Sequence, residues 1–250
     1  HIRREKATSN ICTAQSLLAI ISSFYAIYHG SSGLMKIAKK LVELRINLES
    51  SLSKLGFEIV GGSRFDSFDI YSEFSPEVHT EALKNGYNLR ILPLGSSVKD
   101  SIGFGISLDE LSDEKEIHEI LNFVANAIGK KRDLKQITFD KSFLIEGIPL
   151  RSDPWMQQDV FKSYQSETDL MRYIYRLAEK DFSLVDGMMP LGSCTMKLNS
   201  AAELSPVSWA NLSSIHPFAP ENQTKGYSKI ISDLEKWISE IVGLKSVSFQ

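Results

Sequence analysis

The sequence is poor in cysteine and has no marked excess of charge of either sign. Its two cysteines, Cys12 and Cys194, are too few for a disulfide framework, so we expect free thiols in a reducing compartment. The 28 basic and 31 acidic residues give a formal net charge of −3, which argues against a general role in binding nucleic acid or membrane surfaces. The histidines are scattered without the spacing of metal ligands, so we predict no metal site.

Long apolar runs are also missing. The longest, from Leu17 to Tyr28, is interrupted by Ser22 and Ser23 and falls short of the roughly 20 residues that a membrane-spanning helix needs. We therefore interpret it as a buried helix and expect no membrane segment. A hydrophobic share of 42% with 24% charged residues is typical of a soluble globular protein with a real core.

One short stretch concentrates reactive side chains. The segment from Met188 to Asn199 holds two hydroxyls, a thiol and an amine, which belong to Ser193, Thr195, Cys194 and Lys197. Its own Pro190-Leu191-Gly192 sequence breaks regular structure, and Gly192 can leave its backbone amide open to a ligand. Two interpretations stay open here, a binding-site loop and a surface turn that happens to hold polar residues.

Periodicity over the first 130 residues predicts a mixed helix and strand unit. Polar residues 8–10 can cap a helix that runs to residue 28, and a turn over 29–33 leads into a long amphipathic helix over 34–55 that stops at Gly56. Shorter segments follow, with strands over 57–60, 65–71, 87–92 and 102–108 and helices over 76–84 and 113–128. This order predicts a small α+β sandwich, with helices on one face of a mostly antiparallel sheet.

The later part of the chain changes character. Residues 129–165 have few periodic apolar positions and begin with a basic patch, so we predict a surface linker; the patch is a solvated charge run or a contact for an acidic partner. Ser166 and Asp169 then form a capping sequence for a short helix. A helix over 223–242, stopped by Gly243, and a strand beginning at Val247 predict the entry to a second α/β domain.

Three segments together resemble one family. They are His1–Gln15 (HIRREKATSNICTAQ), Pro190–Asn199 (PLGSCTMKLN) and Ile215-His216-Pro217-Phe218. All three occur in the order found in the glycine cleavage system P-proteins, the glycine dehydrogenases (decarboxylating), and the resemblance covers essentially the whole chain. The first segment lies in the middle of that family's chain, so the resemblance implies an internal fragment.

The resemblance also implies a fold class, α/β, of the pyridoxal-phosphate fold type I. Residues 1–129 would be the end of the family's first half, with helices and its C-terminal small α+β domain. Residues 130–165 would be the linker between halves. Residues 166–250 would be the truncated start of the second half, which binds pyridoxal 5'-phosphate.

The activity implied is pyridoxal-phosphate-dependent decarboxylation of glycine, with transfer of the aminomethyl group to the lipoyl arm of the H-protein. The family acts as a homodimer or an equivalent two-subunit assembly, in the bacterial cytoplasm or the mitochondrial matrix. Its Schiff-base lysine would lie beyond residue 250, so Lys197 is a poor candidate for that role. The fragment alone is expected to be inactive.

Within the fragment, the resemblance points to the edge of an active site. Ser193 and Thr195 would offer hydroxyls, and Gly192 or Cys194 a backbone amide, to the cofactor or the glycine carboxylate. The alternative is that these groups satisfy the loop's own backbone. His216 would shape the cofactor pocket or the carrier's entrance, or else be structural.

Two functions from other classes stay open. The chain could be a non-catalytic regulatory or scaffold subunit related to the enzyme. It could also be a thiol-dependent transferase that uses Cys194 as nucleophile and His216 as its base.

Overall fold

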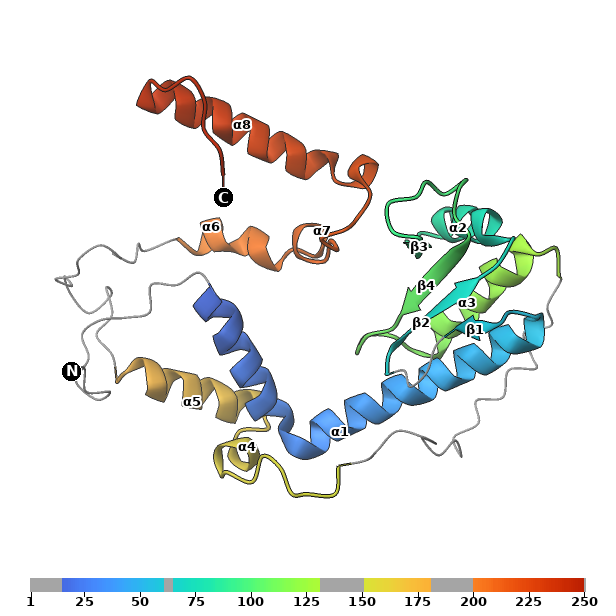
Figure 1. Cartoon of the computed structure of the whole chain (residues 1–250). Helices are drawn as coiled ribbons and strands as arrows, with labels where there is room; N and C mark the ends of the chain where they lie inside the picture. Colours follow the sequence, from blue (N-terminus) through green and yellow to red (C-terminus); the bar gives the residue numbers. More distant parts are fainter. Residues whose placement is uncertain (1–14, 61–64, 131–150, 181–199, 250) are drawn as a thin grey trace. The chain divides into compact units, whose positions relative to one another are not determined.

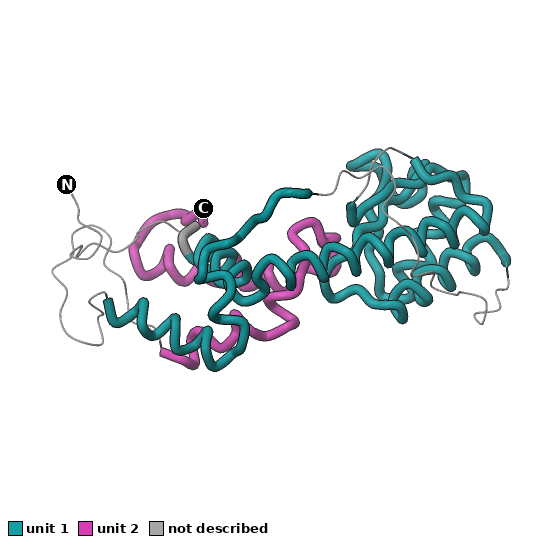
Figure 2. The backbone as a smooth tube through the Cα atoms, turned by 90° about the horizontal axis from the view of Figure 1, so that it is seen from below, with its two compact units in different colours: residues 1–196 teal, residues 197–250 magenta. Residues whose placement is uncertain are grey.

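The computed structural model describes residues 15–60, 65–130, 151–180 and 200–249 (Figure 1). Contacts within the chain divide it into two units, residues 1–196 and residues 197–250, which are coloured separately in Figure 2. Each unit is described by itself. The assignment of residues 1–129, 130–165 and 166–250 to two enzyme halves and a linker stays a prediction.

The longest helix, α1, runs from Gln15 to Leu55 and is kinked at Gly30. There the backbone has φ 59° and ψ −176°, a conformation that glycine adopts far more readily than other residues. Both predicted helical segments therefore form, but a single glycine joins them in place of a turn over 29–33. The predicted cap at residues 8–10 lies outside the described residues.

A four-stranded antiparallel sheet follows, with the strand order β1-β2-β4-β3. Its strands are β1 (Ile59–Val60), β2 (Ser67–Tyr71), β3 (Arg90–Leu92) and β4 (Gly103–Ser107). Along the chain, helix α2 (Ser75–Lys84) connects β2 to β3, and α3 (Glu114–Ala127) follows β4. The predicted order of strands and helices is confirmed, and each observed strand is shorter than the apolar segment that predicted it.

The core of this unit lies on one face of the sheet. In β2 and β4, Phe68 pairs with Ile106 and Ile70 with Phe104, and all four side chains are buried. Because side chains alternate along a strand, these four share one face. They form one cluster with apolar residues of α1, α2 and α3, among them Leu48, Val78 and Leu121. Helices therefore cover one face of an antiparallel sheet, as predicted.

Side-chain caps begin two helices at the predicted positions. Asp113 accepts a hydrogen bond from the backbone N–H of Glu116, at 2.8 Å, at the start of α3. Ser166 accepts one from the N–H of Asp169, at 3.2 Å, at the start of α5 (Glu167–Ala178). A short helix, α4 (Val160–Ser163), precedes α5 within the predicted linker.

The prediction that residues 17–28 form a buried helix is wrong. Leu17 and Leu18 are 61% and 68% exposed, and Ile21 is 54% exposed. Helix α4 packs against α1, and Phe24 meets the ring of Tyr173 in α5 edge to face, with centroids 6.2 Å apart. These neighbours leave several apolar residues of this half of α1 open.

The described part of residues 197–250 is helical and has no buried residue. It comprises α6 (Ala201–Leu204), η3 (Ser205–Ser208), α7 (Ala210–Ser213), η4 (Glu221–Gln223) and α8 (Lys225–Val242). Gly243, with φ 69°, ends α8 as predicted. The strand predicted at Val247 is wrong for residues 247–249, because a strand needs a second strand to pair with and described residues 200–249 contain no strand. Across all described segments, no helix combines the length and apolar character needed to span a bilayer.

Candidate functional site

The predicted site loop lies outside the described residues. Gly192, Ser193, Cys194 and Thr195 all fall within residues 181–199, and the first family-like segment falls largely within residues 1–14. Of the predicted site residues, the structure places His216. The site is therefore built outward from that histidine.

His216 lies in an exposed turn on the connection between α7 and α8. The backbone N–H of Phe218 donates to His216 Nδ1 at 3.0 Å, and the N–H of Ala219 donates to the His216 carbonyl at 2.9 Å. Because Nδ1 acts as an acceptor, the neutral ring carries its proton on Nε2. The turn thus fixes both the orientation and the tautomer of the imidazole.

Neighbouring contacts support this turn. The Trp209 indole N–H donates to the Ser205 hydroxyl at 3.1 Å, and the Tyr227 hydroxyl, in the first turn of α8, donates to the Leu212 carbonyl. The Tyr227 bond therefore joins α8 to α7 across the connection that carries His216, and the Trp209 bond holds the start of α7. The ring of Phe218 lies 5.7 Å from the imidazole, centroid to centroid, and is 90% exposed.

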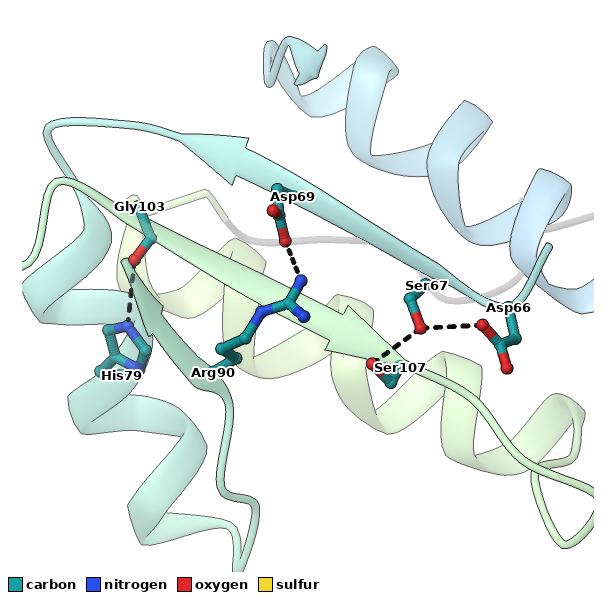
Figure 3. Close-up of polar contacts among 7 residues, drawn as sticks. All are labelled: Asp66, Ser67, Asp69, His79, Arg90, Gly103 and Ser107. Carbon is teal, nitrogen blue, oxygen red and sulfur yellow. Dashed lines mark hydrogen bonds and ion pairs between the residues drawn. The ribbon is translucent and has the colours of Figure 1, made fainter. Parts of the chain in front are cut away.

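The sheet face opposite the core carries a polar cluster that sequence reasoning missed (Figure 3). Arg90 on β3 forms an ion pair with Asp69 on β2, and the pair crosses Gly105 on the strand between them. The Ser67 hydroxyl lies 2.9 Å from Asp66 Oδ1 and 2.9 Å from Ser107 Oγ. The Gly-Phe-Gly-Ile-Ser sequence of β4 was a usable signal, because its alternation puts two glycines on the face away from the core.

A buried histidine packs against the start of β4, an inner strand of the same sheet. His79 of α2 is 3% exposed, and its Nε2 lies 3.4 Å from the Gly103 carbonyl. Burial lowers the pKa of His79, and the hydrogen bond to Gly103 raises it by less. The ring is therefore neutral near pH 7 and packs edge to face on Phe104, which is a structural role.

A cavity of about 400 Å³ lies where α1 and α3 end. Leu55, Phe57, Phe74 and Ile128 supply its apolar wall, and Glu73 and Lys130 are among its polar residues. Lys130 donates from Nζ to the Leu55 carbonyl at 2.8 Å, which places a positive charge at the negative end of α1. Among the residues that the structure describes, no group of three or more potential ligands could hold a metal ion.

Comparison with known proteins shows which family the chain resembles. The family model described as glycine cleavage system P-protein matches residues 1–124. A glycine dehydrogenase (decarboxylating) of Prochlorococcus marinus is 54% identical over 251 aligned residues, which cover 100% of this chain. The chain belongs to the glycine cleavage system P-protein family. Relatives with the same name in a Synechococcus species and in Vibrio parahaemolyticus are 49% and 43% identical to this chain, again over its whole length.

The chain spans 26% of the length of each of these relatives. The match to the family model ends at residue 124, before residues 192–195 and His216, whereas the alignments with the relatives run through both. The family predicted from three sequence segments is confirmed. The roles of Gly192, Ser193, Cys194, Thr195 and His216 stay predictions.

Proposed function

We propose that this chain is part of a pyridoxal-phosphate-dependent glycine dehydrogenase (decarboxylating). The observation that supports it is 43–54% identity to proteins of that name over the whole chain. Since the chain spans about a quarter of their length, the proposed activity belongs to a longer polypeptide. That protein releases CO₂ from glycine and passes the aminomethyl group to the lipoyl arm of the H-protein, and it works as a homodimer or a two-subunit assembly.

The proposal assigns residues 1–129 to the end of the first half of a fold-type-I enzyme, with helices and its C-terminal small α+β domain, and residues 130–165 to the linker. Support comes from the antiparallel sheet with helices on one face, which matches the expected small α+β domain. Residues 166–250 are assigned to the start of the cofactor-binding half. The exposed apolar residues of α8, among them Trp237 and Ile241, agree with an element that belongs to a larger domain.

The described residues fit the edge of a pyridoxal-phosphate site and not its centre. When bound, this cofactor supplies the electron sink for the carbanion that loss of CO₂ leaves. Every lysine in the described segments is exposed, whereas the lysine that holds the cofactor works in a site that excludes competing reactions with water. His216 and Phe218 offer exposed ring faces, so this turn is where we place the contact between the described chain and the cofactor.

Matched variants of His216 in the complete polypeptide test this placement. His216→Asn keeps an acceptor for the Phe218 N–H, since Asn side chains form the same kind of local turn, but it removes the ring. His216→Ala removes both. We expect both variants to lose at least about tenfold in the rate of glycine decarboxylation, a loss of about 1.4 kcal/mol. A wild-type rate in the Asn variant alone would show that only the turn matters.

The loop residues need a separate test. We expect Ser193→Ala and Thr195→Val to slow the exchange of labelled bicarbonate into glycine, measured in the complete polypeptide with lipoylated H-protein, because each removes one hydroxyl donor. Ser228→Ala, on the exposed surface of α8, is the matched control and should exchange at the wild-type rate. Absence of exchange in the unmodified complete polypeptide would favour the non-catalytic scaffold subunit.

Cys194 separates the proposal from the thiol mechanism. We expect Cys194→Ala to retain part of the exchange activity, because the loop would contribute a backbone amide at that position, which alanine also has. Complete loss of exchange activity would favour a thiol nucleophile, provided that the variant is folded and its absorbance shows that the cofactor is still bound.

A further inference from the structure

The two halves of α1 have different surroundings. Between Leu41 and Leu52 the helix faces the core that it forms with the sheet, α2 and α3, where Leu44 and Leu48 are buried; we call residues 31–130 the sheet unit. Residues 15–29, which we call the arm, expose Leu17 and Leu18. The halves meet at Gly30, whose conformation is not helical. Because the regular helix is interrupted there, its own hydrogen bonds do not fix the direction of the arm.

One residue of the sheet unit binds both halves. The Tyr25 hydroxyl, on the arm, donates to Glu110 Oε1 at 3.0 Å. Lys40, beyond the kink, donates from Nζ to the Glu110 carbonyl at 3.1 Å. The sequence separations are 85 and 70 residues, so neither contact is a local consequence of the helix.

Glu110 itself is held in a tight turn between β4 and α3. The Asp109 carboxylate accepts hydrogen bonds from the backbone N–H groups of Leu111, at 2.8 Å, and Ser112, at 3.2 Å. The Ser112 hydroxyl in turn accepts from the Asp109 N–H at 3.1 Å. Glu110 is therefore a fixed point to which the arm and the rest of α1 are attached.

On another side the kink is approached by α4 (Val160–Ser163), near the end of the predicted linker. A side chain added at Gly30 would place its Cβ 2.6 Å from the backbone carbonyl oxygen of Phe161, in α4. Gly30 is thus required by its own φ and by the close approach of α4. Any movement of the arm must change this approach as well.

We propose that Gly30 is a hinge between the arm and the sheet unit, and that Glu110 braces the hinge by binding both halves of α1. The brace on the arm side is one exposed hydrogen bond, which contributes little stability and can open while the sheet unit stays folded. The brace therefore sets the direction of the arm relative to the sheet unit. This inference is independent of the proposed enzymatic function.

Distances between spin labels in the complete polypeptide test the hinge. One label replaces exposed Ser23 on the arm, the other replaces Lys115 on α3, and the remaining cysteines are replaced by serine. We expect one narrow distance distribution without further changes, and a clearly broader one in Tyr25→Phe or Lys40→Met. Because both act through Glu110, the double variant should be no broader than the broader single variant.

Tyr28→Phe is the matched control. It removes a phenol hydroxyl three residues from Tyr25 and keeps the ring contact with His29, so the distribution should stay narrow. Gly30→Ala should shift the mean distance, since alanine favours the right-handed helix. The brace would be overturned if Tyr25→Phe left the distance distribution unchanged, or if the distribution were already broad in the labelled protein without further changes. An unchanged mean distance in Gly30→Ala would overturn the hinge.

Discussion

Gly103 and Gly105 lie on the same face of β4, yet a side chain would meet different neighbours at each. A Cβ at Gly103 would lie 2.5 Å from the backbone carbonyl oxygen of Ile70, whereas at Gly105 it would lie 2.6 Å from Arg90 Nε and 2.7 Å from Asp69 Oδ1. Backbone must shift in the first case, and movable side-chain ends in the second. We therefore expect Gly103→Ala to lower the free energy of unfolding by about 1–3 kcal/mol.

Gly105→Ala serves as the control for that comparison. It disrupts a partly exposed ion pair, so we expect a loss of less than about 1 kcal/mol. Urea denaturation of both variants measures the difference. Equal losses would show that the ion pair, and not the close backbone approach, decides the cost at this face.

His79 makes the stability of the sheet unit depend on pH. Its pKa in the folded protein lies below the ordinary value of 6.5 because the ring is buried. In the window between the two values, the unfolded chain binds a proton that the folded protein does not. The free energy of unfolding should therefore fall as the pH drops below about 6.5, by at most about 1.4 kcal/mol per unit, and level off below the folded pKa.

Urea unfolding between about pH 7.5 and pH 5 measures this dependence. The matched variant His79→Leu fills a similar space without a titrating group, so its unfolding free energy should fall less over the same range. Parallel curves for the two proteins would show that other groups cause the pH dependence.

At the scale of single elements, the cap of α5 is a clear test. Ser166→Ala removes the hydroxyl that accepts from the Asp169 N–H, so we expect the helix start to lose about 1 kcal/mol. Faster amide hydrogen exchange over residues 167–170 measures the loss. Thr168→Ala, an exposed change within the same turn, is the control and should not speed exchange.

Elements whose ends depend on nearby residues could be predicted from the sequence. Asp113 and Ser166 start helices and Gly243 ends one, because each acts on backbone groups within a few residues. The kink at Gly30 was placed within a predicted turn. The two helical segments are joined at this one glycine, and not by a longer turn, because α4 packs against the kink. Helix α4 lies more than a hundred residues further along the chain, so the sequence near Gly30 does not reveal it.

Contacts between distant segments could not be predicted in this way. Arg90 and Asp69 meet over Gly105 only because three strands pair in one register, which alternation alone does not specify. The exposure of Leu18 depends on which elements cover α1, and the spacing of apolar residues does not predict which elements these are. For the candidate site, the family resemblance pointed to His216, but not to the Phe218 N–H that fixes its tautomer.

At the scale of the whole molecule, the sheet unit, which belongs to the teal unit of Figure 2, and residues 197–250, the magenta unit, can be compared by the side chains that they bury. The sheet unit encloses Leu48 and Phe104 completely, whereas in described residues 200–249 no residue is buried and Trp237 is 57% exposed. Burial of about 25 cal/mol per Å² must offset a backbone entropy cost of about 1–2 kcal/mol per residue. We therefore expect residues 31–130, made alone, to unfold cooperatively, and residues 197–250 not to.

Circular dichroism during heating measures whether each segment unfolds cooperatively, and the dispersion of proton NMR chemical shifts measures whether it is ordered. Residues 31–130 leave out the arm, so a cooperative transition there would show that the core around α1, α2, α3 and the sheet is sufficient without it. A cooperative transition in residues 197–250 alone would mean that α6, α7 and α8 bury one another in isolation. If the second segment becomes ordered only in the longer polypeptide, the apolar side of α8 is covered there, since its exposed Trp237 and Ile241 need a neighbour to contribute stability.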